Sequence, residues 1–148
     1  MARAVAGLGR WVRARAGMLA MGVVVAALVA GCFDVHSADL FLLTRTGQGQ
    51  TLTMLVNDGG TIRCNGGKAK PISNTALITA RDLSDNLATD AAGKLNIPKS
   101  PGEVYYYRIR LQQGTIAFPD RASAGHKVLA QAELFAAQAA QRECGLSG

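Results

Sequence analysis

The sequence contains few of the residues from which enzymes usually build an active site. Only two histidines occur among its 148 residues, His36 and His126, and neither is close in sequence to Cys64 or Cys144. The chain also lacks the Gly-X-Ser-X-Gly nucleophile motif, the His-Glu-X-X-His zinc motif, the phosphate-binding P-loop and the dinucleotide-binding glycine motif. We therefore expect no enzymatic activity, no catalytic residue, no metal site and no cofactor.

Regular repeats are lacking as well. The chain shows neither a Gly-X-Y nor a heptad repeat, which excludes a fibrous protein. Its hydrophobic content of 49% is too high for a disordered chain. A length of 148 residues suits one folded domain and leaves little room for a second.

Acidic residues are missing from the first fifteen positions, which contain Arg3, Arg10, Arg13 and Arg15. From residue 32 onward, twelve Lys and Arg stand against ten Asp and Glu, so that 12 − 10 leaves a charge of about +2. The net charge of +6 therefore comes mostly from the N-terminal end of the chain. For this reason the basic composition does not indicate a nucleic-acid partner.

A run of fifteen uncharged residues, from Ala16 to Ala30, follows this basic segment. As a helix it would span about 22 Å, less than the roughly 30 Å of a bilayer's hydrocarbon core. Its length and its basic flank are compatible with a retained membrane anchor and with an export signal. The residues at the end of the run favour an export signal.

These residues, Leu28-Val29-Ala30-Gly31-Cys32, resemble the lipobox of bacterial lipoproteins, in which small residues precede an obligatory cysteine. The resemblance implies that residues 1–31 are a removed signal peptide and that Cys32 carries acyl chains such as palmitate. Residues 32–38 would then tether a domain to the outer face of a cell membrane. Two or more acyl chains hold a protein firmly on a membrane. Ordinary secretion and a retained helix are the alternatives.

The number of cysteines supports the same interpretation. There are three, Cys32, Cys64 and Cys144, and an odd number in an exported protein needs an explanation for one of them. Lipidation of Cys32 leaves an even pair in a compartment where disulfides persist. We therefore predict a Cys64–Cys144 disulfide that closes a loop of about 80 residues and stabilises the fold by about 4 kcal/mol.

Residues 39–148 are predicted to form a single α+β domain. Alternating apolar residues predict strands, and apolar residues at intervals of three or four predict helices. The predicted strands are 39–45, 51–56, 61–64, 104–112 and 115–118, and the predicted helices are 74–92 and 126–143. The segment 65–71 is expected to break the sheet. The order βββαββα predicts an antiparallel sheet with both helices packed on one face.

A possible binding surface lies on the predicted strand 104–112. Tyr106, Arg108 and Arg110 alternate along it and therefore share one face. Strands with aromatic and basic side chains can bind single-stranded nucleic acid, but a nearly neutral, exported domain gives little support to that role. These residues either form an ordinary solvent-facing surface or bind an envelope protein or a polyanionic cell-wall ligand.

From the first strand to Gly114, the order of elements is similar to that of secreted subtilisin-inhibitor-like proteins. The shared features are strands, a cysteine that ends a strand, a helix, a proline-bearing loop and a strand that ends at Gly114. The resemblance implies an exposed inhibitory loop around Pro98, Lys99 and Ser100, with Lys99 as the residue offered to a serine protease. The cysteines that clamp this loop in the family have no counterpart here.

We thus predict a small, non-catalytic cell-envelope lipoprotein whose domain binds a partner or serves as a scaffold. Its expected partners are the membrane, through the lipid anchor, and an envelope protein or a cell-wall ligand. A protease-inhibitor-like protein and a glycan- or small-ligand-binding lipoprotein are the alternatives.

Overall fold

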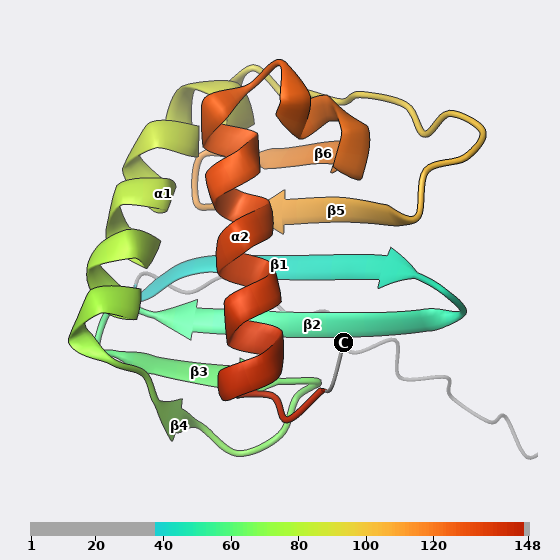
Figure 1. Ribbon diagram of the computed structural model, residues 1–148. Helices are drawn as coiled ribbons and strands as arrows, with labels where there is room; N and C mark the ends of the chain where they lie inside the picture. The colour runs from blue at the N-terminus through green and yellow to red at the C-terminus, as the bar shows by residue number, and fades with distance from the viewer. Residues whose placement is uncertain (1–37, 147–148) are drawn as a thin grey trace, which may run out of the picture. The chain divides into compact units, whose positions relative to one another are not determined.

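The computed structural model describes residues 38–146. Six antiparallel strands form one sheet in the spatial order β4-β3-β2-β1-β5-β6 (Figure 1). In chain order the elements are β1 (Asp39–Gly47), β2 (Gln50–Asn57), β3 (Thr61–Cys64), β4 (Lys70–Pro71), α1 (Asn74–Ala92), β5 (Tyr105–Arg110), β6 (Thr115–Pro119), the 3-10 helix η1 (Asp120–Ala124) and α2 (Lys127–Arg142).

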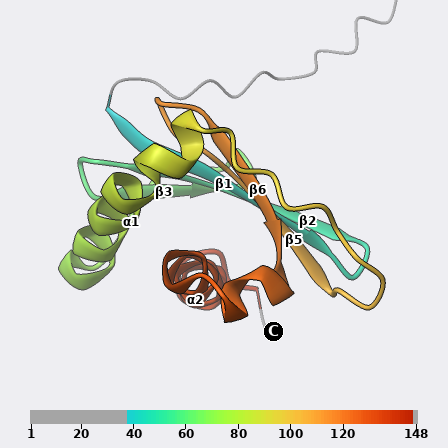
Figure 2. The ribbon, with the colours of Figure 1, turned by 90° about the horizontal axis from the view of Figure 1, so that it is seen from above.

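Both α1 and α2 lie on the same side of the sheet, and the other side, which neither of them covers, is called the open side (Figure 2). Successive strand residues point to opposite faces, so every second side chain is buried against the helices. In β2, Leu52, Met54 and Val56 are 3%, 0% and 0% exposed, whereas the residues between them are partly exposed. The predicted α+β class, with two helices on one face of an antiparallel sheet, is confirmed.

Each helix follows from a local sequence signal. Ser73 caps α1, because its Oγ accepts a hydrogen bond from the backbone N–H of Ala76 at 3.2 Å. Apolar residues at helical spacing then bury one stripe of each helix. The buried residues are Ala80, Leu83, Leu87 and Ala91 in α1, and Leu129, Ala132, Phe135, Ala136, Ala139 and Ala140 in α2. Within residues 38–146, neither helix is long and apolar enough to cross a bilayer.

Aromatic pairs join the layers and the strands. Phe135 of α2 packs edge-on against Phe41 of β1, with ring centroids 5.7 Å apart. Tyr107 of β5 stacks on Phe118 of β6 at 5.3 Å. Such pairs add about 0.5–1.5 kcal/mol each to the free energy gained by burying their apolar area.

The segment Asn57-Asp58-Gly59-Gly60, whose composition is typical of a hairpin turn, connects β2 to β3. Asn57 pairs with Thr61, and the side-chain oxygen of Asn57 accepts a hydrogen bond from the N–H of Gly59 at 2.8 Å. Gly60 has a φ of 81°, a left-handed conformation that glycine adopts at little cost. These features close the connection between β2 and β3.

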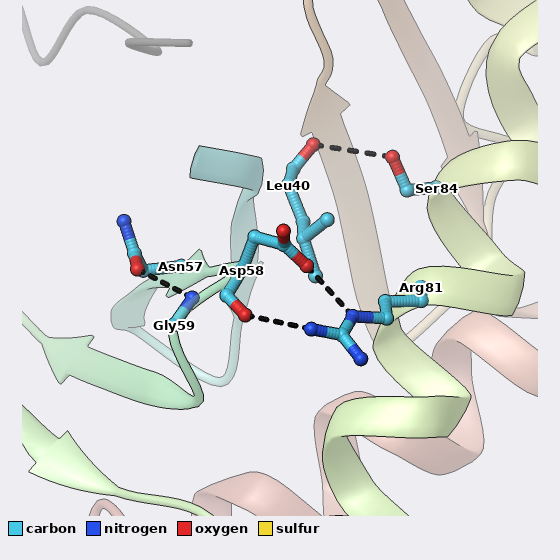
Figure 3. A network of polar contacts seen from close by, with 6 residues as sticks. All are labelled: Leu40, Asn57, Asp58, Gly59, Arg81 and Ser84. Carbon is cyan, nitrogen blue, oxygen red and sulfur yellow. Dashed lines mark hydrogen bonds and ion pairs between the residues drawn. The ribbon is translucent and has the colours of Figure 1, made fainter. Parts of the chain in front are cut away.

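This hairpin is also bound to α1. The Nε of Arg81 donates to Asp58 Oδ1 at 2.7 Å, and its Nη2 donates to the Asp58 carbonyl at 3.0 Å (Figure 3). Ser84, three residues later, donates its hydroxyl to the Leu40 carbonyl at 3.4 Å. Polar contacts thus position the first half of α1 over one end of the sheet.

Several segments differ from the sequence prediction, among them β1, which continues to Gly47 beyond the predicted end at residue 45. The segment 65–71 does not simply break the sheet, since Lys70–Pro71 form β4 and pair with β3. An edge strand tolerates proline because the missing N–H would face away from its partner. The structure shortens the predicted strand 104–112 to Tyr105–Arg110, and it adds η1 at residues 120–124, where the sequence predicts only a connection.

Candidate functional site

The open side of the sheet carries arginines, threonines and two leucines. Its central residues come from β1, β2, β3 and β5, and each alternates with a side chain that faces the helices. We call this surface the arginine face and define it by Leu42, Thr44, Leu55, Arg63, Arg108 and Arg110.

The strand register arranges these side chains in rows. Leu42 lies opposite Arg110 on one side and opposite Leu55 on the other, and Leu55 lies opposite Arg63. Since neighbouring strands are about 4.8 Å apart, the backbones of Arg63 and Arg110 are roughly 14 Å apart, with the two leucines between them. In the next row, Thr44 lies between Arg108 and Thr53.

The guanidinium groups of this face differ in exposure. Arg63 and Arg108 are exposed, and neither side chain has a hydrogen bond or an ion pair within residues 38–146. Arg110 is partly buried and makes an interaction of its own. The two rows contain no carboxylate. Asp39, at the start of β1, pairs with Asn57 of β2 and accepts a hydrogen bond from Asn57 Nδ2 at 3.0 Å.

Sequence reasoning missed Arg63 as a member of this surface. The available signal was the alternation of β3, in which Ile62 is fully buried and Arg63 must therefore point to the open side. What the sequence could not supply is the register, which places Arg63 in the same row as Arg110 although the two residues are far apart in the chain.

Tyr106 lies on the same side of β5 as Arg108 and Arg110, but its hydroxyl is engaged by the chain itself. The hydroxyl donates its proton towards two acceptors, Asn96 Oδ1 at 3.1 Å and the Ile97 carbonyl at 3.2 Å. Tyr106 therefore joins the arginine face to the loop that precedes β5. It is a positioning residue for this loop, in addition to its place on the predicted binding face.

This loop, residues 93–104, is anchored at both ends. The N–H of Ala117 donates to the Leu95 carbonyl at 2.9 Å, and the N–H of Ile97 donates to the Ala117 carbonyl at 2.8 Å. At the other end, the side chain of Asp120 accepts hydrogen bonds from the N–H groups of Val104 and Tyr105 at 3.1 and 3.2 Å. The segment between these anchors projects from the fold.

The predicted inhibitory residues lie in this projecting segment. Pro98, Lys99 and Ser100 are all exposed. The carboxylate of Glu103 accepts a hydrogen bond from the backbone N–H of Ser100, and Gly102 turns the chain with a φ of 88°. A contact within the loop thus holds the backbone next to Lys99.

The predicted disulfide is confirmed. Cys64 and Cys144 are bonded, with their Cα atoms 5.6 Å apart. Cys64 ends β3, and Cys144 follows the end of α2, so the bond joins the sheet to the helical layer. Cys32 and the tether up to residue 37 lie outside the described residues.

A second polar feature, which the sequence did not reveal, lies beneath β5. Asp120 Oδ1 and Glu133 Oε1 are buried and have no hydrogen-bond partner in the described part of the chain. Burial raises the pKa of Glu133, and the negative charge of Asp120 adds to this effect, while a hydrogen bond from Ser123 opposes it. Burial, together with Glu133, raises the pKa of Tyr107 to about 12. This cluster is a source of pH-dependent stability.

Two pockets of the described fold are lined by residues outside the arginine face. A pocket of about 410 Å³ lies beside Arg45 and Tyr105, where the guanidinium lies 4.8 Å from the centre of the tyrosine ring. It is the place at which a glycan or another small ligand would be sought. A groove of about 380 Å³ runs between α1 and α2, past Leu134. Within residues 38–146, no group of three or more His, Cys, Asp or Glu is placed to hold a metal ion.

Comparison of the chain with known proteins found no significant match. No protein-family model matches the chain, and no curated protein or solved structure matches it at a significant level.

Proposed function

We propose that this chain is an exported cell-envelope lipoprotein, anchored through acyl chains on Cys32, whose α+β domain serves binding or scaffolding and not catalysis. The observation that carries the proposal is the Cys64–Cys144 disulfide. It accounts for two of the three cysteines and leaves Cys32, in the lipobox-like Leu28-Val29-Ala30-Gly31-Cys32, as the one cysteine available for lipidation.

The same disulfide supports export. Structural disulfides persist in oxidising compartments and are rare in the cytosol, where thiols are kept reduced. The basic segment before Ala16 and the uncharged run to Ala30 have the order of an export signal. Removal of residues 1–31 would leave Cys32 as the first residue of the mature chain, seven positions before β1.

The binding role rests on the arginine face. Arg63 and Arg108 are exposed on the sheet surface that neither α1 nor α2 covers, and this arrangement suits an anionic partner in the envelope. An envelope protein or a cell-wall ligand fits this description, whereas nucleic acid is not an expected partner of an exported domain.

Lipidation is tested by metabolic labelling of bacteria that express the full chain, with an alkyne fatty acid as the label. We expect label on the wild-type protein, a corresponding mass increase at Cys32, and recovery of the protein in the membrane fraction. Cys32→Ser should abolish all three results, whereas Cys64→Ser/Cys144→Ser should keep the label. Unlabelled wild-type protein in the soluble envelope fraction would overturn the proposal.

Protease inhibition is a second candidate, favoured by the loop around Lys99. Lys99 is exposed, and Glu103 holds the N–H of the following residue, which restrains the backbone as an inhibitory loop requires. Titration of trypsin-like and subtilisin-like proteases with residues 33–148 tests this candidate. Stoichiometric loss of activity, abolished by Lys99→Ala, would support it. Rapid cleavage after Lys99 without inhibition would exclude it.

A further inference from the structure

We propose that the partner of the arginine face is the anionic phospholipid headgroup surface of the membrane to which the chain is anchored. The domain would lie with its open sheet side towards the bilayer and with α1 and α2 towards the surrounding compartment. This inference rests on the proposed lipid anchor, which would place the domain at a membrane. The contact with the headgroups, however, would be made by the folded domain alone.

Charge is distributed unequally between the two sides of the sheet. Arg63, Arg108 and Arg110 lie on the open side, in rows without a carboxylate. On the helical side, the exposed acids Asp82 and Asp85 on α1 are balanced by the exposed bases Lys127 and Arg142 on α2, so this side has little net charge. An anionic surface therefore attracts the open side more strongly than the helical side, and the small net charge of the domain does not prevent an oriented encounter.

The shape of the face matches a surface better than it matches a small ligand. The three arginines extend over three strand spacings, roughly 14 Å, on the sheet side opposite α1 and α2. The pockets described above lie beside Arg45 and between the helices. Guanidinium groups form paired hydrogen bonds with phosphate oxygens, which are the exposed groups of a phospholipid headgroup.

The length of the tether favours the membrane over a distant polymer. Seven residue steps separate Cys32 from Asp39, the first residue of β1. Fully extended, these steps span at most about 25 Å, so an acylated Cys32 would keep the sheet close to the headgroups at all times. Tethering at this distance raises the effective concentration of headgroups around the arginine face, and weak individual contacts then suffice.

Vesicle binding by the unacylated chain tests the headgroup chemistry directly. Residues 33–148 contain the whole core and the disulfide, so this chain is expected to fold alone. We expect it to sediment with phosphatidylglycerol vesicles at low salt and to stay in solution with phosphatidylcholine vesicles. Binding should decline steeply with salt, because the Debye length falls from about 10 Å at 0.1 M to about 3 Å at 1 M.

Arg63→Gln/Arg108→Gln should weaken this binding by about 25-fold, or about fivefold for each charge removed. Lys127→Gln/Arg142→Gln removes the same charge from exposed positions on α2 and is the matched control, which should retain most of the binding. Arg63→Lys/Arg108→Lys keeps both charges but loses the paired hydrogen bonds of the guanidinium groups, so it should bind more tightly than the glutamine pair and less tightly than the wild type. Equal losses in the two glutamine pairs would overturn the proposal.

A second measurement reports orientation. The chain that begins at Cys32 has one free thiol when the disulfide is intact, so it can be coupled to a maleimide lipid in phosphatidylglycerol vesicles or nanodiscs. With a gadolinium lipid present, we expect stronger NMR line broadening for amides of β1, β2 and β5 than for amides of α1 and α2. Stronger broadening of the helices would overturn the proposal.

These experiments separate the two proposals. Chemical coupling supplies the anchor whether or not cells lipidate Cys32, and the vesicle assay needs no anchor at all. Failure of metabolic labelling with intact vesicle binding would reject only the lipoprotein assignment. Labelling without vesicle binding would reject only the headgroup contact. Binding to an anionic polysaccharide or an oligonucleotide, without binding to the vesicles, would reject the headgroup contact as well.

Discussion

Cys64, at the end of β3, and Cys144, just beyond the end of α2, are joined across 80 positions of sequence with their Cα atoms 5.6 Å apart. The bond connects the β4 side of the sheet to the end of the helix that packs over the sheet centre. It also fixes the last described turn of the chain, in which the N–H of Leu146 donates to the Ala140 carbonyl at 3.0 Å. The C-terminal end of the domain is therefore held to the sheet covalently.

Loss of this bond should lower the free energy of unfolding by about 4 kcal/mol, because the unfolded chain gains the entropy of an open loop of about 80 residues. The measurement is urea unfolding of residues 33–148 with and without dithiothreitol, beside Cys64→Ala/Cys144→Ala. The variant should unfold at the midpoint of the reduced wild type and should not respond to the reductant. An unchanged midpoint on reduction would contradict the prediction.

Gly114, the glycine of the β5–β6 turn, should be difficult to replace. A Cβ at this position would overlap the backbone carbonyl of Ala91 near the end of α1. Gly114→Ala must move either the turn or the helix end, at a cost of about 1–3 kcal/mol. Gly125→Ala is the control, since its Cβ would meet no atom within 4 Å and its φ is −103°. Urea midpoints that are equal for the two variants would show that the close contact carries no strain.

The sequence predicts the strands and helices because their signals are local. Burial of every second residue in β2 and of one helical stripe in α1 depends on a few neighbouring positions. The spacing of the apolar residues in the sequence therefore predicts it. The disulfide was also predictable, from the number of cysteines and not from geometry. By contrast, β4 exists only through its pairing with β3, since Lys70–Pro71 alone has no strand signal.

The candidate site was predictable only in part, because strand pairing, unlike the alternation within one strand, leaves no local pattern in the sequence. Alternation places Arg108 and Arg110 on one face of β5, but the row that adds Arg63 depends on the register of four strands. The contact of Tyr106 with Asn96 depends on how the loop folds back over the sheet edge. Such relations belong to tertiary packing, and a single sequence carries no local pattern for them.

Stability should depend on pH through Glu133. Burial raises its pKa, so the native state favours the protonated form. The stabilisation from protonation is fully present below the unfolded pKa of about 4.5 and is lost as pH rises through the native value. Glu133→Gln should therefore be more stable than the wild type at pH 7, and the difference should shrink towards pH 4.

Urea midpoints between pH 4 and pH 8 measure this effect. Asp82→Asn, an exposed position on α1, controls for the change of net charge and should follow the wild-type profile. Parallel profiles for the wild type and Glu133→Gln would show that the carboxyl group is not destabilised in the native state.

The loop that carries Lys99 should loosen when the hydroxyl of Tyr106 is removed. Tyr106→Phe deletes the donor that reaches Asn96 Oδ1 and the Ile97 carbonyl, at a cost of about 1 kcal/mol. This cost raises the population of the locally opened loop about fivefold, and trypsin cleavage after Lys99 should accelerate by the same factor. Tyr105→Phe is the control, because a phenylalanine ring keeps the contact with Arg45. The cleavage rate after Lys99 is followed by mass spectrometry at a fixed trypsin concentration, and equal rates in both variants would show that the Tyr106 hydroxyl does not restrain the loop.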